Sequence, residues 1–458
     1  MVTRSSRCIA GFAAAALCGF AVAHDGDLDR SFGSNGIAVI DFGASAIAYG
    51  LGVAPDGKIV LGGSVDGGVA TGTDFAVARL TRDGQPDTGF SFDGKTTVAV
   101  GSGAAYDSAF STIVQSDGKI VVIGEGPDTA VSGDDSDIKL VRLNTDGTLD
   151  TTFSGDGKAY VNFDLGGANT DRALDGVQLA DGKLVVVGSA DVTGQGIDFA
   201  IAKLNVDGSR DTSFGSAGRV TLRFDLSATF LDEIASSVAI DAAGNILVAG
   251  IAPKSSAFDN DFAIARLTPN GSLDPNFGGD GRVTVAFDIG GNLDDEALEL
   301  IAGPDGSIFV TGVATDNGYD FAAAKLLADG TLDPSFGNGG KATVPFDLGG
   351  SNSDLSYGSA LQPDGKLVLA GFVPVSATDS DIALARLSVN GSLDSTFGFA
   401  GKRTIAVNLG GELTDAAIRA RIQGGYLVFG GATSTAPSIF SFLAGRVVID
   451  TVFDNGFD

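Results

Sequence analysis

The sequence has almost no sulfur-containing or imidazole side chains. Its 458 residues include two cysteines, one histidine, one methionine and no tryptophan. Zinc, haem and iron–sulfur sites, and Cys or His nucleophiles, therefore have almost no groups to use. Glutamate is also scarce, because only five of the 57 acidic residues are Glu and the rest are Asp. Since Glu favours helices while Asp and Gly favour turns, this bias predicts β-structure with many tight turns.

The formal net charge of −28 excludes two further classes of function. A strongly acidic surface repels nucleic acid and anionic lipid, so we expect neither as a partner. The 44% of hydrophobic residues are enough to build a core, which separates this chain from disordered acidic tails.

Residues 1–23 have the pattern of a secretory signal peptide. Arg4 and Arg7 precede an apolar stretch, 8–20, and Ala21-Val22-Ala23 forms a small-x-small cleavage site. Cleavage after Ala23 would remove both cysteines from the chain. No later apolar run is long enough to cross a bilayer. We therefore expect a periplasmic, cell-surface or extracellular protein that is monomeric, without membrane insertion, and folded as one domain over 24–458.

The rest of the chain repeats with a period of about sixty residues. Each unit begins with a turn, typically Asp-Gly-Lys, whose central glycines are Gly57, Gly118, Gly182, Gly244, Gly306, Gly365 and Gly425. A β-branched run such as 58–63 follows the turn, and a second strand such as Asp261-Phe262-Ala263-Ile264-Ala265-Arg266-Leu267 comes after a variable loop. A compact turn, for example 390–397, and a last strand, for example 158–163, complete the unit. Each unit therefore predicts four short strands.

Seven units of four strands predict an all-β fold, a seven-bladed β-propeller. The N-terminal part of the chain carries only the end of a unit, and the seventh unit lacks its last strand. We therefore expect residues 37–42 to complete the last blade and close the ring, which removes exposed sheet edges. An open β-solenoid is the alternative, and it would leave an unpaired strand at each end.

The repeated pattern resembles a known family. An Asp-Gly-Lys strand, an Asp-Phe-Ala-x-Ala-Arg-Leu strand, an Asp-Gly-x-Leu-Asp-x-x-Phe-Gly turn and a final strand are similar to the delta-sixty repeat family. The resemblance extends from residue 25 to about 453, and only the seventh unit departs from the motif. It implies a bacterial exported β-propeller domain of unassigned function, and it brings no catalytic residue.

Two motifs that recur in nearly every unit are expected to be structural. The Asp-Gly-Lys turn fits a type I′ or similar hairpin, in which Asp and Gly tolerate positive φ. The Leu-Asp-x-x-Phe turn should insert its Leu and Phe into the blade, while its Asp bonds backbone N–H groups. That Asp also lies within reach of the basic residue of the preceding strand, and Arg266 with Asp274 is the example we expect.

Candidate site residues lie in the crossovers between blades and in the variable loops, which a propeller brings to one face. The crossovers contribute Asp164 with Asp171, Asp288 with Asp294 and Asp295, and Asp347 with Asp354, and looser copies pair Asp225 with Asp232 and Asn408 with Asp415. The variable loops add Asp134, Asp135, Asp137, Asp259 and Asp261. Crowded carboxylates suit Ca²⁺, which takes six to eight oxygen ligands. The alternative is that these carboxylates cap turns and remain hydrated.

For function, the sequence favours binding over catalysis. We expect a non-enzymatic binding or scaffold module that holds a protein or glycan partner on its Asp/Gly-rich loop face, with no cofactor other than Ca²⁺. The alternative is a hydrolase that uses paired aspartates at the mouth of the ring. The absence of tryptophan disfavours the hydrolase, because sugar-binding sites commonly stack their ligands on aromatic rings. A desolvated carboxylate pair in the central channel, present in one sector only, would favour it.

Overall fold

The computed structural model of the chain describes residues 24–67, 72–101, 106–127, 136–167, 169–229, 231–256, 258–290, 293–410 and 414–449. The expected signal peptide, Asp134, Asp135 and the last nine residues, 450–458, lie outside this described part.

All secondary structure in the described ranges is β, arranged as seven antiparallel sheets of four strands. The first blade contains β2 (Ala46–Val53), β3 (Ile59–Asp66), β4 (Thr73–Leu80) and β5 (Lys95–Val98). The second contains β6 (Ser108–Val114), β7 (Ile120–Pro127), β8 (Ser136–Leu143) and β9 (Lys158–Val161). The third contains β10 (Asp171–Gln178), β11 (Leu184–Val192), β12 (Gly196–Leu204) and β13 (Arg219–Leu222). The fourth contains β14 (Ile234–Ile240), β15 (Ile246–Pro253), β16 (Asn260–Leu267) and β17 (Arg282–Val285).

The remaining blades follow the same order. The fifth contains β18 (Asp295–Ala302), β19 (Ile308–Thr315), β20 (Tyr319–Leu326) and β21 (Lys341–Val344). The sixth contains β22 (Leu355–Leu361), β23 (Leu367–Pro374), β24 (Ser380–Leu387) and β25 (Lys402–Ile405). The seventh contains β26 (Asp415–Gln423), β27 (Tyr426–Ala436), β28 (Ile439–Val448) and β1 (Ile37–Ile40). No helix in the part of the chain that the structure describes could cross a membrane.

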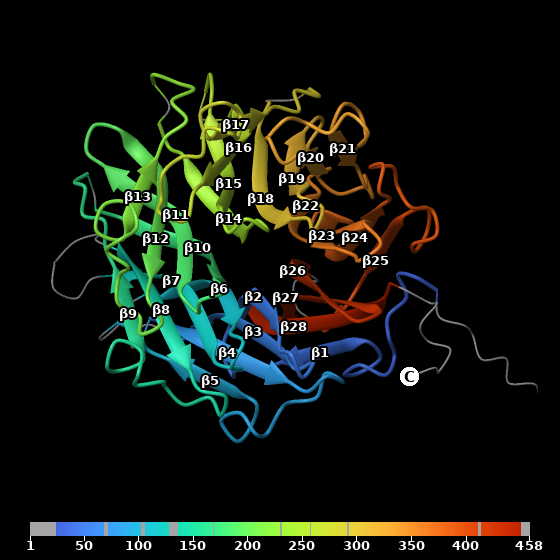
Figure 1. Cartoon of the computed structure of the whole chain (residues 1–458). Helices are drawn as coiled ribbons and strands as arrows, with labels where there is room; N and C mark the ends of the chain where they lie inside the picture. Colours follow the sequence, from blue (N-terminus) through green and yellow to red (C-terminus); the bar gives the residue numbers. More distant parts are fainter. Residues whose placement is uncertain are drawn as a thin grey trace, which may run out of the picture.

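The seven blades form a closed ring, as the sequence predicts (Figure 1). The first strand of each blade lies at the centre, and β1 lies beside β28, with Ile37 opposite Gly445 and Ile40 opposite Phe442. The closing strand ends two residues earlier than the predicted 37–42, because Phe42 leaves the ladder and packs its ring 4.8 Å from that of Phe442. The open solenoid is therefore wrong.

The N-terminal segment also supplies the turn that the seventh repeat lacks. Arg446 on β28 donates from Nε to Asp29 Oδ2 at 2.7 Å, and its guanidinium lies 5.0 Å from the centre of the Phe32 ring. Asp29 and Phe32 belong to Leu28-Asp29-Arg30-Ser31-Phe32, so these residues act as the Leu-Asp-x-x-Phe turn of the last blade.

The hydrophobic core lies between neighbouring blades. Side chains of a strand alternate between its two faces, so one buried strand serves two interfaces. Leu184 and Val186 of β11 pack with Val121 of the second blade, whereas Val185 and Val187 pack with Ile246 of the fourth. This explains why the strand that directly follows the first turn of each unit, such as β11, is a continuous β-branched run.

A repeated Arg–Asp pair holds each Leu-Asp-x-x-Phe turn to its blade. Arg266 Nε donates to Asp274 Oδ2 at 2.9 Å, which confirms the expected pair, and its Nη1 donates to the carbonyl of Ala328 in the next blade at 2.5 Å. Phe277 is fully buried beneath the guanidinium, at 4.9 Å from the ring centre. The leucine of the turn is less buried than predicted, since Leu393 is 37% exposed.

The Asp-Gly-Lys turn is not type I′. Gly57 has φ +82°, but Asp56 is absent from the residues with positive φ. The Gly57 N–H donates to the carbonyl of Ala54, and Asp56 Oδ1 accepts the N–H of Lys58. Only the glycine therefore needs the left-handed region, as in a type I turn followed by a bulge. The aspartate is selected for its side-chain hydrogen bond.

Every inner strand carries a β-bulge at the same place. In β10 the register shifts between Ala173 and Asp175, and in β18 between Ala297 and Glu299. The residue after each bulge is Gly50, Ser111, Asp175, Ser237, Glu299, Gly358 or Arg419. The fold is thus regular, whereas the residues that it brings to the centre differ from blade to blade.

Candidate functional site

The crossovers between blades are shaped by one buried aspartate each. Asp295 Oδ2 accepts the backbone N–H of Phe287, and Asp354 Oδ2 accepts that of Phe346, both at 2.6 Å. Asp171 accepts the N–H of Phe163 in the same way. The turn-capping interpretation therefore holds for one oxygen of each of these carboxylates.

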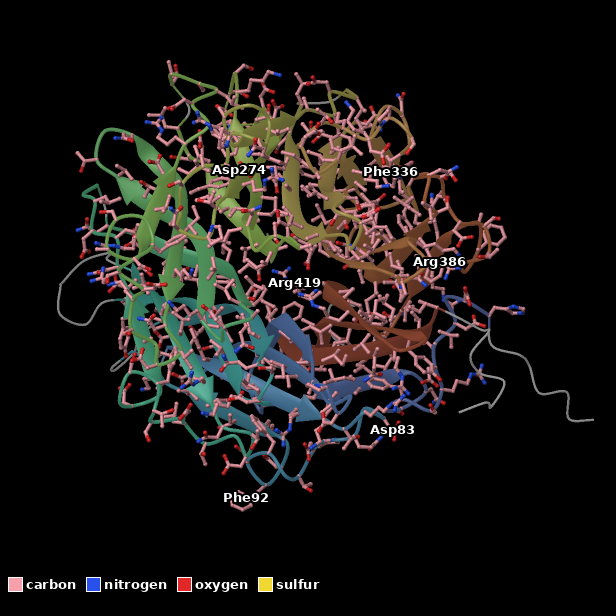
Figure 2. The ribbon with its side chains drawn as sticks, in the orientation of Figure 1. Asp83, Phe92, Asp274, Phe336, Arg386 and Arg419 are labelled. Atoms are coloured by element: carbon pink, nitrogen blue, oxygen red, sulfur yellow. The ribbon has the colours of Figure 1, made fainter. Side chains whose placement is uncertain are left out.

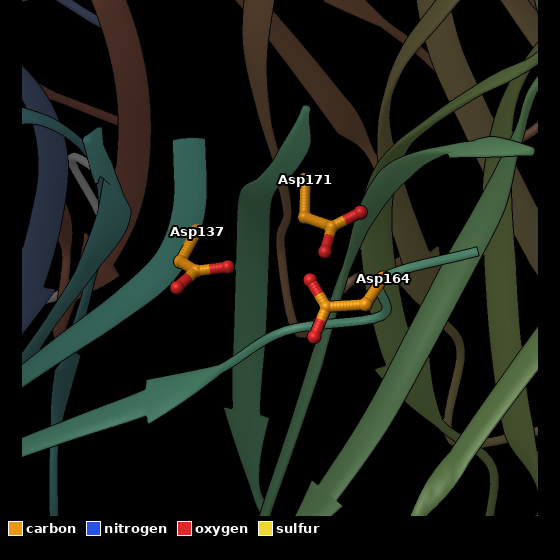
Figure 3. A group of neighbouring side chains, drawn as sticks. All are labelled: Asp137, Asp164 and Asp171. Atoms are coloured by element: carbon orange, nitrogen blue, oxygen red, sulfur yellow. The ribbon is translucent and has the colours of Figure 1, made fainter. Parts of the chain in front are cut away.

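Two further aspartates meet each capping aspartate. One, the second residue of the third strand of the preceding blade, is Asp137, Asp261 or Asp320. The other, which follows the crossover phenylalanine, is Asp164, Asp288 or Asp347. We call the three sets the junction triads: Asp137–Asp164–Asp171, Asp261–Asp288–Asp295 and Asp320–Asp347–Asp354. Among the described residues, only the first triad brings one oxygen of each member within 4.8 Å of the others. Figure 3 shows the Asp137 and Asp164 carboxylates directed toward that of Asp171.

The backbone holds the middle member of each triad in an unusual conformation. Asp164, Asp288 and Asp347 have φ of 48°, 48° and 50°, in the left-handed region that Asp and Asn tolerate better than most residues. All three side chains are exposed, whereas the capping aspartates are at most 1% exposed. Each triad therefore opens to solvent on one side and is closed on the other.

The buried carboxylates are not fully satisfied. Oδ1 of Asp171, Asp295 and Asp354 has no hydrogen-bond partner among the described residues. Burial, together with the charges of Asp137 and Asp164, raises the pKa of Asp171 to about 7. Burial and the charges of Asp261 and Asp288 raise the pKa of Asp295 to about 6. Burial and the charges of Asp354 and Asp347 raise the pKa of Asp320 to about 6.

Two other junctions contain a basic side chain of the protein itself. Between the third and fourth blades, Arg223 lies between two carboxylates, with Nε 3.4 Å from Asp198 Oδ1 and Nη2 2.9 Å from Asp225 Oδ1. Between the first and second blades, the buried Lys139 Nζ lies 3.1 Å from Asp107 Oδ1. A basic side chain thus lies beside the carboxylates of these junctions, although burial and the charges of Glu233 and Asp225 still raise the pKa of Asp198 to about 7.

The junction between the sixth and seventh blades has fewer free carboxylate oxygens. Asn408 replaces the crossover aspartate, and Asp415 Oδ1 accepts a hydrogen bond from Thr433 Oγ1 at 2.6 Å.

Two of the expected candidates have other roles. Asp294 does not join the triad beside it, because its Oδ1 accepts from Asn260 at 2.7 Å and its Oδ2 from the Tyr319 hydroxyl at 2.5 Å. Asp259 Oδ2 accepts from the backbone N–H of Ser255 at 3.1 Å. Asp134 and Asp135 lie outside the described residues.

The expected pairing of Asp225 with Asp232 is wrong by one residue. Glu233 is the capping residue there, and its carboxylate accepts the N–H groups of Phe224 and Asp225 at 2.7 and 3.0 Å. The extra methylene of Glu lets a side chain in the same register reach the same backbone groups. The Asp-to-Asp spacing used for the other crossovers conceals this substitution.

Sequence reasoning missed the third-strand residues Asp320 and Asp198. Both stand directly before the Phe-Ala of the second strand signal, where Asp261 also stands. The signal was therefore present as an aspartate repeated once per unit. The sequence does not show, however, that this aspartate lies beside the crossover about 34 residues later, because a loop of variable length separates the two.

A second group of charged residues lies in the central channel. Five inner strands line a cavity of about 440 Å³ that contains Asp175, Glu299 and Arg421. Arg421 Nη1 donates to Glu299 Oε1 at 2.9 Å, and Arg419 Nε lies 3.7 Å from Oε2. Figure 2 shows Arg419 near the centre of the ring.

Both carboxylates of this cavity already have partners. Asp175 accepts hydrogen bonds from Ser111 Oγ at 2.8 Å and from Ser237 Oγ at 3.1 Å. Glu299 is bound by the two arginines, although burial raises its pKa. The carboxylate pair is thus present in the channel, but both acids are used to hold side chains in place.

The crossover face also carries exposed apolar side chains. Leu165, Ile289, Leu348 and Leu409, one in each of four crossovers, are 41%, 41%, 45% and 48% exposed. The phenylalanine two residues before each of the first three is at most 8% exposed. The same short motif therefore sends one side chain into the core and another to the surface.

The likeness of this chain to solved structures lies in the fold. It is similar to a protein of unknown function from Dyadobacter fermentans DSM 18053 (11% identity, 91% of this chain and 98% of that chain, TM-score 0.45). It is similar to the polysaccharide lyase Uly1 (11%, 88% and 90%, 0.47) and to the WD40 propeller domain of Doa1 (12%, 90% and 97%, 0.43). At such identities and TM-scores these likenesses carry no argument about function.

A search of curated sequences finds no significant match. A family model described as "Domain of unknown function (DUF5122) beta-propeller" matches six segments, 54–90, 115–153, 179–214, 244–277, 303–336 and 362–397. Each segment runs from the first turn of a unit to the phenylalanine of its Leu-Asp-x-x-Phe turn, which is the part that packs alike in every blade. These matches place the chain among the β-propeller repeat proteins of unknown function.

Proposed function

We propose that the protein is an exported, non-enzymatic binding propeller that holds a protein partner on its crossover face. The observation that carries this proposal is the set of exposed aliphatic residues Leu165, Ile289, Leu348 and Leu409. Export rests on the signal-peptide pattern of residues 1–23. The repeat motif further favours the delta-sixty repeat family as the specific family.

Packing explains the repeated phenylalanine of the crossover but not the repeated leucine. Phe163, Phe287 and Phe346 are buried in the interfaces between blades. The aliphatic residue two positions later is exposed, so its repetition does not serve the core. We infer from this repetition on one face that these side chains contact another molecule.

The charge of the same segments indicates the chemistry of the partner. Each exposed aliphatic residue of the junction crossovers directly follows an exposed aspartate, for example Leu348 after Asp347. Apolar contacts ringed by carboxylates fit a protein surface with apolar and basic side chains. A glycan fits less well, because this face offers few exposed rings, Tyr106 and Phe258 among them.

Site-specific photo-crosslinking tests this proposal. A benzophenone amino acid is placed at residue 289 or 348 on the crossover face, and at 206 or 389 on the opposite face as matched controls. Val206 and Val389 are 51% and 54% exposed, so accessibility is at least as great at the control positions. We expect protein crosslinks in the producing cells from 289 and 348 only. Equal crosslinking from both faces, or none from the crossover face, would overturn the proposal.

The crosslinked partner is then titrated against purified variants. The triple variant Leu165→Asp/Ile289→Asp/Leu348→Asp should bind at least about tenfold more weakly, because truncating apolar anchors removes most of the binding free energy. The control Val206→Asp/Val389→Asp should bind normally. Unchanged melting midpoints for both variants would show that the loss is local.

One observation favours hydrolysis as a second candidate function. Glu296 of β18 is half-buried, and burial with the charge of Asp294 raises its pKa to about 7. A general acid needs such a pKa. Hydrolysis of a panel of 4-nitrophenyl glycosides, lost in Glu296→Gln, would support this candidate, and activity that is equal in the variant would exclude Glu296.

A further inference from the structure

The three junction triads take their residues from corresponding positions of two blades and the crossover between them, and in the first the oxygens gather within 4.8 Å of one another. The third strand of one blade supplies Asp137, Asp261 or Asp320, and the start of the next blade supplies Asp171 of β10, Asp295 of β18 or Asp354, which directly precedes β22. Any ligand that binds all three carboxylates of a triad therefore joins neighbouring blades directly.

The capping aspartates leave one buried oxygen unused. Asp171 and Asp295 are 0% exposed and Asp354 is 1% exposed, and in each the Oδ1 atom lacks a hydrogen-bond partner among the described residues. An unpaired buried oxygen is costly and rare in folded proteins. In the first triad, the carboxylates of Asp137 and Asp164 approach this side chain (Figure 3). Carboxylates that approach one another repel. A bound cation would both compensate their charges and give the unpaired oxygen a partner.

The molecule contains its own comparison at the junction of the third and fourth blades. There the corresponding acids are Asp198, Asp225 and Glu233, and the guanidinium of Arg223 occupies the space between the first two. Arg223 directly follows β13, and the residues that follow β9, β17 and β21 are Asn162, Ala286 and Pro345. A positive group thus fills this position where the sequence provides one.

Other basic side chains near the junction triads are engaged elsewhere or lie at a distance. Lys341 Nζ donates to the carbonyl of Ala286 at 2.8 Å, and Lys402 donates to that of Pro345. Arg219 donates to the carbonyls of Asn162 and Phe163. At the junction that contains Arg223, Arg282 donates in the same way to the carbonyl of Arg223 at 2.6 Å. This backbone contact therefore occurs whether or not a basic side chain lies between the acids.

The Lys254 ammonium approaches the second triad. Its Nζ lies 3.7 Å from Asp261 Oδ2, and its side chain is 47% exposed. An exposed lysine at this distance contributes little.

We propose that each junction triad binds a divalent cation, Ca²⁺, that links one blade to the next. All the side-chain donors are carboxylate oxygens, which suit a hard cation, and they come from three different segments, which suits the irregular geometry that Ca²⁺ tolerates better than Mg²⁺. This use of the carboxylates goes beyond partner binding, because it acts within the ring.

Calorimetric titration of the chelator-stripped mature chain tests the proposal. We expect about three Ca²⁺ ions per chain and a higher melting midpoint in Ca²⁺ than in chelator, because a ligand that binds only the folded state stabilises it. Mg²⁺ at the same concentration is the comparison and should raise the midpoint less. No binding heat together with an unchanged midpoint would overturn the proposal, as would equal effects of the two ions.

Single substitutions locate the ions. Asp164→Asn, Asp288→Asn and Asp347→Asn each remove one charge from an exposed position whose φ Asn tolerates, so these variants should fold. Each should lower the stoichiometry by one. The matched control is Asp225→Asn, at the junction that contains Arg223, and it should leave the stoichiometry unchanged. A loss in the control as large as in the others would show that the charge of the face, not the triads, attracts the ion.

The reverse change should create a site. Arg223→Ala removes the internal cation and leaves Asp198 and Asp225 beside Glu233, whose two oxygens each accept one backbone N–H and keep lone pairs for a cation. We expect the stoichiometry to rise by one. A stoichiometry that stays at the wild-type value would contradict the equivalence of the four junctions.

Discussion

At the scale of single residues, Glu299 is the carboxylate on which the two channel arginines depend. It is 6% exposed, and it contacts Arg421 at 2.9 Å and Arg419 at 3.7 Å. Asp175 acts on Arg421 through its charge, whereas its hydrogen bonds are with the hydroxyl groups of Ser111 and Ser237. Removing the charge of Glu299 would leave the two guanidinium groups with the charge of Asp175 but without the carboxylate that they contact directly.

We therefore expect Glu299→Gln to lower the free energy of unfolding by about 2 kcal/mol. Breaking a fully buried pair costs ~3–5 kcal/mol, and the value is lower here because the Arg421 side chain is 37% exposed. Urea unfolding measures the change. The matched control is Glu125→Gln, whose partner Arg172 has a 54% exposed side chain, and it should cost less than about 0.5 kcal/mol. Equal losses in the two variants would contradict a special role for Glu299.

The sequence could not identify Glu299 as a channel residue. It lies in a strand that reads like the other inner strands, and its side chain meets Arg419 and Arg421 only because the ring brings the fifth and seventh blades together. Asp164 and Asp171 were predictable as candidates, since both lie in one crossover. Asp320 was not, because its proximity to Asp354 depends on the closed arrangement of two successive blades.

At the scale of elements, β1 is the strand that converts a linear array of repeats into a ring. Its four residues pair with β28, and Asp25 and Asp29 of the preceding segment contact Arg386 and Arg446 at 2.7 and 2.5 Å. Arg386 belongs to the sixth blade and Arg446 to the seventh. The N-terminal segment thus completes one blade and bridges it to its neighbour.

Deletion of residues 24–42 should open the ring. The edge of β28 would lose its partner, and an unpaired edge strand promotes association between chains. We expect a lower melting midpoint and a shift from monomer to larger species in light scattering coupled to gel filtration. The control Asp25→Asn/Asp29→Asn keeps β1 and removes only the charges, so it should remain monomeric. A monomeric deletion variant would show that closure by β1 is dispensable.

The strands were predictable because their pattern repeats, whereas turn geometry was not. Seven glycines at a period of about sixty residues determined the number of blades, and the missing end of the last unit indicated closure. Dipeptides such as Asp56-Gly57 fit two turn types, however, and only the backbone shows that φ is positive at the glycine alone. Similarly, the alternation of apolar and polar residues along a strand does not reveal a β-bulge such as that between Ala297 and Glu299.

At the scale of the whole molecule, the pKa values of the aspartates are shifted in opposite directions on the two faces of the ring. On the face of the first turns, aspartates of the Leu-Asp-x-x-Phe motif have cationic and hydroxyl partners. A hydrogen bond from Lys183, with others from Ser213, lowers the pKa of Asp211 to about 2. Hydrogen bonds from Ser335 and Lys325 lower the pKa of Asp333 to about 2. On the crossover face, by contrast, burial and mutual repulsion raise the pKa values of the capping aspartates.

These lowered pKa values predict how the ring unfolds in acid. A carboxyl group whose pKa is lower in the folded state than its ordinary value near 4 binds more protons when unfolded. Its contribution to stability is therefore complete above about pH 4 and is lost as the pH falls through 4 to 2. Because such pairs recur from blade to blade, we expect the free energy of unfolding, measured with urea in chelator at constant ionic strength, to fall steeply between pH 4 and pH 2.

Lys183→Met isolates one of these groups. Without the ammonium, which lies 2.8 Å from Asp211 Oδ2, the folded-state pKa of Asp211 should rise toward its ordinary value. The variant should then be less stable than the wild type at pH 6 but closer to it at pH 2, where Asp211 is about half protonated in the wild type and largely protonated in the variant. Lys158→Met is the control, because Lys158 Nζ donates to the carbonyl of Ala99, whose affinity for the ammonium does not change in this range. A loss of stability that is the same at pH 6 and pH 2 in Lys183→Met would mean that Lys183 stabilises the turn through packing, not through the charge of Asp211.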